Sequence, residues 1–105
     1  LNEKLNSLAN NLIEKNVKLI FVPTANKYDI YHSHIQQANE YKKSNYFQLF
    51  KNKKKEYIYI DTDEILTNVV KSGELDLYLA DDSHWSYKAA DIVSKNILSK
   101  INLIY

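Results

Sequence analysis

The 105-residue sequence contains no cysteine, no arginine and no methionine, and only one glycine and one proline. The absence of cysteine excludes disulfides and thiol chemistry, although it fits either redox compartment. The absence of arginine excludes the planar guanidinium that binds phosphates and carboxylates through two parallel hydrogen bonds. Because a glycine-rich phosphate loop is also missing, nucleotide binding is not indicated, and we expect no cofactor.

The charges nearly balance, with 14 lysines against 13 acidic residues and a formal net charge of +1. This balance demands neither nucleic acid nor an acidic membrane as a partner. A basic run over 51–55 contains no aromatic residue, so we interpret it as a solvated turn rather than a polyanion contact. No apolar run is long enough to span a bilayer, and no signal-peptide pattern is visible.

Length and composition together indicate one α/β domain or a piece of a larger one. A chain of 105 residues forms a single domain at most. Complete α/β enzymes use several glycines in the turns that face a ligand, whereas this chain has only Gly73. The chain also begins at Leu1 and lacks methionine. We therefore expect residues 1–105 to be a single domain or, more in keeping with these features, a fragment of a larger protein.

Hydrophobic spacing predicts helices and strands that alternate along the chain. Apolar residues three and four apart predict amphipathic helices, and short β-branched runs predict buried strands. In chain order these are a helix over 1–15, a strand over 17–22, a loosely helical stretch over 28–50, a strand over 57–60, a helix from Thr62 or Asp63 to Ser72, a short extended segment over 77–79 and a helix over 89–101. Asn16 and Gly73 are expected to end helices, and Ser86 to cap the last one. This order favours a parallel sheet with helices on both faces.

The stretch over 81–86 reads Asp-Asp-Ser-His-Trp-Ser and places two carboxylates and an imidazole within four residues. An imidazole acts as a general base when a carboxylate accepts from its other nitrogen and fixes its tautomer. Asp81 and Asp82 are both close enough in sequence to His84 to be that carboxylate. On local sequence alone, the same residues also fit a surface turn that caps the following helix.

A metal site is a further alternative for these residues. Asp81, Asp82 and His84 offer ligands, but no second histidine lies at ligand spacing on the same element. His32 and His34 would share one side only in an extended segment, where they could bind a metal together with His84. Exposed polar residues on a helix or loop explain the pair more simply, and we assign no metal.

A histidine base needs a nucleophile, and no serine of this chain is well placed to be one. Ser83 and Ser86 are too close in sequence to His84 to meet its imidazole in the usual geometry. Ser72 lies late in a predicted helix. None of the serines lies in a strand–turn–helix elbow with small neighbours, the remaining ones being Ser7, Ser33, Ser44, Ser94 and Ser99.

Three blocks of the sequence resemble the SGNH (GDSL-like) hydrolase superfamily. The closest resemblance is to its branch of cell-envelope polysaccharide O-acetyltransferases, which includes the alginate acetylation proteins. The block over 77–90 resembles the Tyr…Asp-x-His-Trp-x-x-x-Gly-Ala pattern of that branch, although Lys88 stands where the family usually has glycine. The segments over 21–31 and 60–66 resemble its Val-Pro-x-x-Lys…Tyr and Val-Asp-Leu…Leu segments.

The resemblance implies a Ser-His-Asp esterase or acyltransferase on a three-layer αβα, flavodoxin-like fold with a parallel sheet, of which this chain is a part. His84 takes the position of the general base. The acetyltransferase branch has its aspartate two residues before the histidine, which is Asp82. Ordinary SGNH hydrolases have it three residues before, which is Asp81; we favour Asp82. The nucleophilic serine and the glycine and asparagine of the oxyanion hole would lie outside this chain.

We therefore expect part of an SGNH-like esterase or O-acyltransferase that acts on acetylated carbohydrate and is inactive without its serine. Asn26 and Lys27, in the loop that follows the first strand, and Trp85 are candidate substrate-binding residues. The expected partners are a carbohydrate or acyl ester and, through open sheet edges, a second copy of the chain. The expected location is extracytoplasmic, in the periplasm or cell envelope. The alternative is a non-catalytic binding or structural domain with the same fold.

Overall fold

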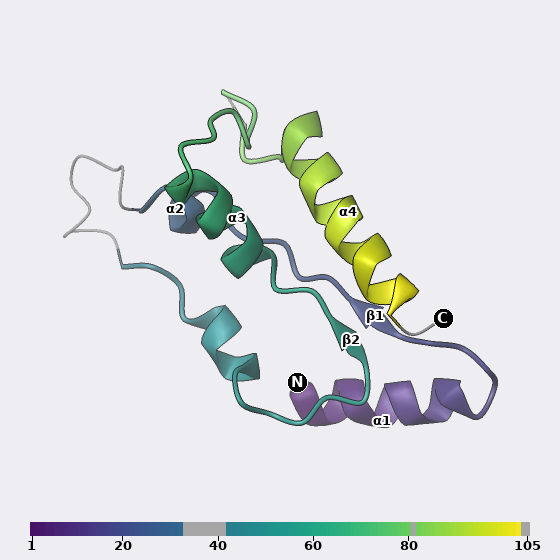
Figure 1. Ribbon diagram of the computed structural model, residues 1–105. Helices are drawn as coiled ribbons and strands as arrows, with labels where there is room; N and C mark the ends of the chain where they lie inside the picture. Colours follow the sequence, from purple (N-terminus) through teal and green to yellow (C-terminus); the bar gives the residue numbers. More distant parts are fainter. Residues whose placement is uncertain (33–41, 81, 104–105) are drawn as a thin grey trace.

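The computed structural model describes residues 1–32, 42–80 and 82–103 (Figure 1). They form helices and short strands. In chain order these are α1 (Asn2–Ile13), β1 (Ile20–Phe21), α2 (Lys27–Ile30), the 3₁₀ helix η3 (Tyr46–Phe50), β2 (Ile58–Tyr59), α3 (Thr62–Lys71) and α4 (Tyr87–Asn102). The predicted mixed α/β class is confirmed.

The two strands β1 and β2 form a parallel sheet in which Ile20 lies opposite Ile58. The amide of Ile58 donates to the carbonyl of Leu19 at 2.9 Å. The amide of Ile60 donates to the carbonyl of Phe21 at 3.0 Å. The parallel orientation expected from the sequence is therefore correct for these two strands.

The first strand is much shorter than the prediction over 17–22, and its flanks explain why. Asn16 has a left-handed backbone (φ 59°), and the amide of Val17 donates back to the carbonyl of Leu12 at 2.9 Å. This bond closes the end of α1, so the Val17 amide is not available to the sheet. At the other end, Pro23 has no amide hydrogen to donate. Asn16 ends the helix as predicted, and the same turn delays the strand.

The N-terminus of α3 differs from the prediction. The N-cap is Asp61, whose side chain accepts from the amide of Glu64 at 2.9 Å, so the expected cap at Thr62 or Asp63 is wrong. Asp61 follows β2 at the position from which its carboxylate reaches an unpaired amide of the first helical turn. Thr62 is already helical. At the other end, Gly73 has a left-handed backbone (φ 96°) and supplies the predicted turn.

The last helix, α4, begins as the sequence predicted. Ser86 is its N-cap and accepts from the amide of Ala89 at 3.3 Å. The same hydroxyl donates to the carbonyl of Asp76 at 2.5 Å. One side chain therefore ties the start of α4 to the segment that follows α3.

Of the loosely helical stretch predicted over 28–50, the described residues form α2 and η3, and residues 33–41 lie outside the description. The buried rings of η3 pack against the sheet. Phe50 lies 5.7 Å from Phe21 and 5.1 Å from Tyr59, between ring centroids. This aromatic cluster covers the two strands.

A second buried cluster joins α3, α4 and the loop between them. It includes residues of both helices and of the loop, together with the residue that follows β2, and all of them are fully or almost fully removed from solvent: Ile60, Leu66, Val70, Leu77, Ala89 and Val93. Burying a valine, leucine or isoleucine side chain contributes about 1.5–3 kcal/mol. The cluster fixes the loop that carries the histidine motif, the segment with Asp82 and His84, against the rest of the chain.

Candidate active site

The histidine motif lies in a loop closed by an antiparallel bridge between Tyr78 and Trp85. Inside the bridge, the amide of Leu79 donates to the carbonyl of His84 at 3.0 Å. The extended segment expected over 77–79 is thus one arm of the loop, and Trp85 begins the return into α4. Between the arms, the amide of Asp82 donates to the carbonyl of Leu79 at 3.3 Å.

Asp82 and His84 are joined through one carboxylate oxygen. Oδ1 of Asp82 accepts from the backbone amide of His84 at 2.8 Å and is also hydrogen-bonded to Nδ1 of the imidazole. An aspartate that accepts from the amide two residues further on forms an Asx turn. The Asp-x-His spacing therefore brings carboxylate and imidazole together by a purely local fold of the chain.

The other side of the imidazole faces solvent. The side chain of His84 is 80 % exposed, and that of Asp82 is 43 % exposed. With Nδ1 bound to the carboxylate, Nε2 is the nitrogen left to exchange a proton, and no residue in the described ranges hydrogen-bonds to it. The hydrogen bonds from the backbone amide of His84, and then from its imidazole, lower the pKa of Asp82. The carboxylate thus stays charged and remains an acceptor.

Asp82 does not cap the following helix, as the alternative reading of the sequence would have it. Ser86 caps α4, and the carboxylate of Asp82 is bonded to His84 instead. Asp81 lies outside the described residues. The assignment of Asp82 rather than Asp81 as the residue that orients His84 therefore stays a prediction.

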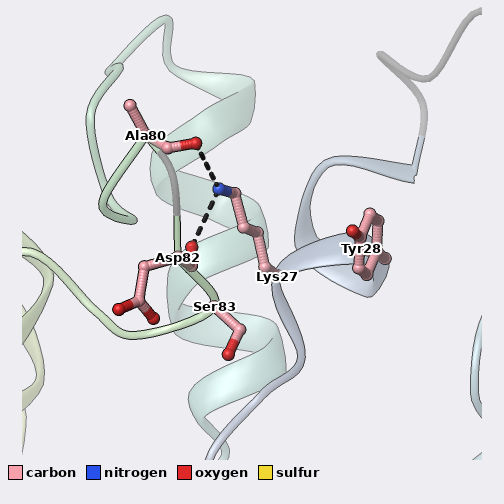
Figure 2. A pocket seen from close by; sticks show the side chains of 5 residues that line it. All are labelled: Lys27, Tyr28, Ala80, Asp82 and Ser83. Carbon is pink, nitrogen blue, oxygen red and sulfur yellow. Dashed lines mark hydrogen bonds between the residues drawn. The ribbon is translucent and has the colours of Figure 1, made fainter.

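Lys27, a candidate substrate-binding residue, lies directly behind the turn. Its ammonium group donates to the carbonyls of Leu79 at 2.8 Å, Ala80 at 3.3 Å and Asp82 at 3.0 Å. Figure 2 shows two of these bonds, from Lys27 at the start of α2 to the carbonyls of Ala80 and Asp82 in the loop. The structure therefore brings Lys27 next to the predicted catalytic pair, with its charge directed at the backbone.

The other two candidate substrate-binding residues also have local partners. Asn26 caps α2, its side chain accepting from the amide of Tyr28 at 2.8 Å. The indole Nε1 of Trp85 donates to the hydroxyl of Tyr78 at 3.3 Å. Contact of either residue with a substrate stays a prediction.

Two open hollows flank the turn, with volumes of about 340 and 330 Å³. The first is lined by Lys27, Tyr28, Ala80, Asp82 and Ser83 (Figure 2). The second is lined by Thr24, Ala25, Ser83, His84 and Trp85. Ser83 borders both hollows, so the Asp82–His84 pair is accessible from two sides.

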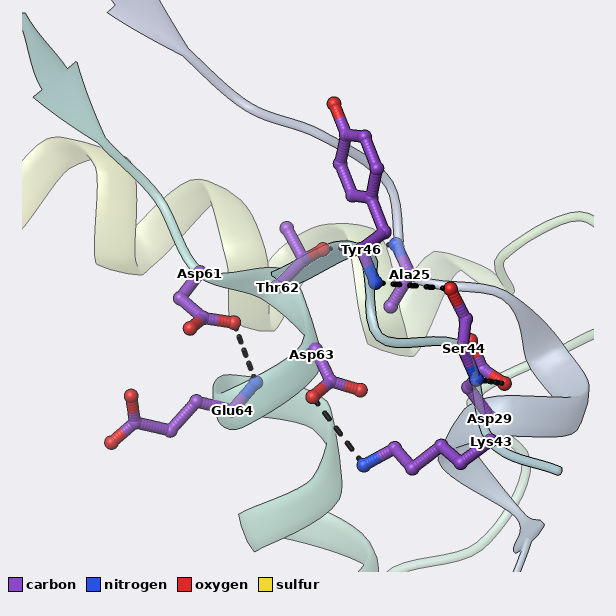
Figure 3. A network of polar contacts seen from close by, with 9 residues as sticks. All are labelled: Ala25, Asp29, Lys43, Ser44, Tyr46, Asp61, Thr62, Asp63 and Glu64. Carbon is purple, nitrogen blue, oxygen red and sulfur yellow. Dashed lines mark hydrogen bonds and ion pairs between the residues drawn. The ribbon is translucent and has the colours of Figure 1, made fainter. Parts of the chain in front are cut away.

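Two buried hydroxyls that sequence reasoning did not assign hold the segment opposite His84. Thr62 is completely buried, and its hydroxyl accepts from the amide of Ala25 at 2.9 Å (Figure 3). The same hydroxyl donates to the carbonyl of Pro23 at 2.5 Å. The hydroxyl of Tyr78 donates to the carbonyl of Ala25 at 2.9 Å, and burial raises the pKa of Tyr78 to about 12. Both contacts join residues far apart in sequence, and no local pattern signals them.

Within residues 1–32, 42–80 and 82–103, no three His, Cys, Asp or Glu side chains come together as metal ligands. His34, part of the alternative metal site with His32 and His84, lies outside these ranges. The described residues give that alternative no support.

A carboxylate bonded to Nδ1 of an exposed histidine, on a loop of a mixed α/β chain, is typical of hydrolases and acyltransferases that activate a serine hydroxyl. The family comparison agrees with this class. A family model for the SGNH hydrolase-like domain of the acetyltransferase AlgX matches residues 2–103, and the chain belongs to this family. The resemblance seen in the sequence is thereby confirmed.

Comparison with curated proteins and with solved structures gave no match. Among the helices of the described ranges, none is long and apolar enough to cross a membrane.

Proposed function

We propose that this chain supplies the histidine and aspartate of a Ser-His-Asp site that transfers or hydrolyses an acetyl group on a carbohydrate hydroxyl. The observation that carries the proposal is the hydrogen bond between Asp82 and Nδ1 of His84, which leaves Nε2 open to solvent. Membership of the AlgX acetyltransferase family supports acetyl as the group and polysaccharide as the carbohydrate.

In this reaction Nε2 of His84 takes the proton of a serine hydroxyl while the serine oxygen attacks the acyl carbonyl carbon. Asp82 keeps hydrogen on Nδ1 and stabilises the imidazolium that forms. Nε2 then returns the proton to the leaving alcohol, and an acyl-serine remains. Attack by water through the same base gives hydrolysis, whereas attack by a sugar hydroxyl gives transfer.

The serine itself is proposed to come from outside this chain. Within those residues, no serine hydroxyl is hydrogen-bonded to His84. Several serine hydroxyls have other partners: Ser72 donates to the Val69 carbonyl, Ser86 to the Asp76 carbonyl and Ser94 to the Asp91 carbonyl. The oxyanion hole would come with the serine.

We further propose that β1 and β2 belong to a larger three-layer, flavodoxin-like parallel sheet, completed by further strands or by a second copy. The radius of gyration is 15.5 Å, against about 13 Å for a compact domain of this length. Large apolar side chains are also exposed on several elements, among them Leu8, Ile13, Val17, Leu49 and Leu98. Family membership supports an extracytoplasmic location for this domain.

A non-catalytic binding or structural domain is the second candidate. The observation that favours it is the high exposure of His84, 80 % for the side chain, with no serine hydroxyl hydrogen-bonded to it in the part of the chain that is described. In that case the Asp82–His84 turn only shapes the loop.

The test uses the protein expressed with any flanking sequence that its gene encodes, and measures hydrolysis of p-nitrophenyl acetate. We expect His84→Ala to lower kcat by about 10²–10⁴-fold, the usual contribution of a general base. Asp91→Ala, which removes an exposed ion pair with Lys95 on α4, serves as the control. Full turnover by His84→Ala would contradict the assignment.

A fluorophosphonate probe separates the two candidates. An enzyme of the proposed kind is labelled on a serine, and the label is lost in His84→Ala because the serine is no longer activated. A folded protein that takes no label would favour the non-catalytic domain.

A further inference from the structure

Three backbone carbonyls of the histidine loop converge on the ammonium group of Lys27. The distances from Nζ are 2.8 Å to Leu79, 3.3 Å to Ala80 and 3.0 Å to Asp82. All three acceptors lie shortly before His84 in the chain. Within the described ranges, Nζ forms no ion pair with a carboxylate.

This arrangement matches a lysine better than any other side chain. Carbonyl oxygens carry partial negative charge, so three that point at one place repel each other unless a cation lies between them. An ammonium group has three hydrogens and no acceptor, and it can satisfy three converging carbonyls at once. Hydrogen bonds from a charged donor are also roughly twice as strong as neutral ones. Removing the charge would therefore release the loop.

The base of Lys27 is itself firmly held. Lys27 is the first residue of α2, whose cap is Asn26. Ala25, two residues before Lys27, is buried and hydrogen-bonded on both sides. The hydroxyl of Thr62 accepts from its amide, and the hydroxyl of Tyr78 donates to its carbonyl. The side chain thus connects an anchored segment after β1 with a loop some 52 residues further along the chain.

We propose that Lys27 is a positioning residue that sets the Asp82–His84 pair through the loop backbone, without contacting the reacting atoms. Its carbonyl partner at Asp82 belongs to the residue whose side chain holds the imidazole, so movement of that carbonyl moves the carboxylate as well. The effect of Lys27 on catalysis rests on the proposed function, whereas its stabilisation of the loop does not.

This role differs in its kinetics from direct substrate binding by Lys27. Loss of a substrate contact raises KM and leaves kcat nearly unchanged. Loss of positioning lowers kcat instead, because the base no longer meets the hydroxyl in a reactive geometry, and a shift of about 1 Å can cost up to about 100-fold. We expect Lys27→Met, which keeps length and removes charge, to lower kcat by about 10- to 100-fold with little change in KM.

Chemical rescue tests the cation requirement. Lys27→Ala opens a space beside the three carbonyls, and added methylammonium offers them the same donor group. We expect methylammonium to raise the kcat of Lys27→Ala several-fold. Tetramethylammonium has no N–H donor and should not raise it. Lys88→Met is the control, because Lys88 also donates to a carbonyl, that of Leu75, outside the loop. It should retain normal kcat.

Hydrogen exchange provides a readout that does not depend on activity. The amides of Leu79 and Asp82 donate to the carbonyls of His84 and Leu79 within the loop. We expect both amides to exchange about tenfold or more faster in Lys27→Met, and at the native rate in Lys88→Met. Unchanged exchange in Lys27→Met would overturn the proposal. A normal kcat of Lys27→Met would also overturn it if His84→Ala were inactive in the same assay. Full activity of His84→Ala would overturn the proposed function instead, and exchange alone would then decide whether Lys27 holds the loop.

Discussion

Tyr78 and Trp85 lie opposite each other in an antiparallel bridge, and the indole Nε1 of Trp85 donates to the Tyr78 hydroxyl at 3.3 Å. The pair closes the loop that presents His84. Because the same hydroxyl donates onward to the carbonyl of Ala25, the closure is also attached to the segment after β1. Loop geometry and sheet geometry are thus linked by one buried phenol.

Tyr78→Phe should loosen this link without leaving a large cavity. It removes two hydrogen bonds and leaves the Ala25 carbonyl without its donor, so we expect a loss of about 1–3 kcal/mol in the free energy of unfolding. Urea denaturation measures the change. Tyr87→Phe is the matched control, since Tyr87 is 96 % exposed and should change stability little. Equal stabilities for the two variants would argue against the linking role.

The raised pKa of Tyr78 predicts a specific alkaline dependence. Burial raises it to about 12 from an ordinary value of about 10, so the unfolded chain loses this proton first as pH rises. The stabilisation is complete below pH 10 and is lost as pH rises toward about 12. We expect the stability of wild type to fall more steeply than that of Tyr78→Phe between pH 10 and 12. Parallel curves would show that Tyr78 ionises in the folded protein as it does in the unfolded chain.

Thr62 and Thr67 on α3 form a matched pair for testing buried hydroxyls. The hydroxyl of Thr62 bridges the Pro23 carbonyl and the Ala25 amide, whereas that of Thr67 is buried and has no partner in the described residues. Thr62→Val should therefore cost about 2–4 kcal/mol, because it leaves two backbone groups unpaired. Thr67→Val should be neutral or stabilising, since an unpaired buried hydroxyl is itself unfavourable. Thermal and urea unfolding measure both, and a reversed order would contradict this account.

The sequence predicted those features that depend on neighbouring residues. Asn16, Gly73 and Ser86 were correctly placed, because a helix end is decided by the few residues around it. The Asp-x-His turn is local for the same reason. The family resemblance added the identity of the domain, which neither propensity nor spacing alone gives.

The features that depend on distant partners were not predictable. Lys27 bonds to carbonyls 52 to 55 residues away, and Thr62 to an amide 37 residues away. Patterns of neighbouring residues do not indicate contacts over such distances in the chain. The length of β1 also depends on its neighbour, since an extended run counts as a strand only where a second strand pairs with it. The predicted run over 17–22 accordingly exceeds the paired residues.

The lowered pKa of Asp82 can be measured directly. The backbone amide of His84 is the main cause and its imidazole the next, both favouring the charged carboxylate, so the carboxyl of Asp82 should titrate below its ordinary value of about 3.9. The resulting stabilisation exists above that ordinary value and is lost as pH falls through the lower, folded-state one. Carbon-13 NMR of the carboxyl group gives the midpoint. In His84→Ala the pKa should stay lowered, though less, because the amide still donates; a midpoint at or above 3.9 in wild type would contradict the turn.

Asp82→Asn and Asp81→Asn together decide which carboxylate orients His84. Asparagine at position 82 can still accept from the amide of His84, so the turn survives, but its neutral oxygen no longer stabilises an imidazolium. We expect Asp82→Asn to lower kcat for p-nitrophenyl acetate by about 10²–10⁴-fold at nearly unchanged stability. Asp81→Asn should keep kcat within about threefold, an effect below about 1 kcal/mol on the barrier. The opposite ranking would move the orienting role to Asp81 and place this domain with the hydrolases whose aspartate lies three residues before the histidine. A large loss in both variants would show that the charge of the loop as a whole, rather than the contact with Nδ1, supports the base.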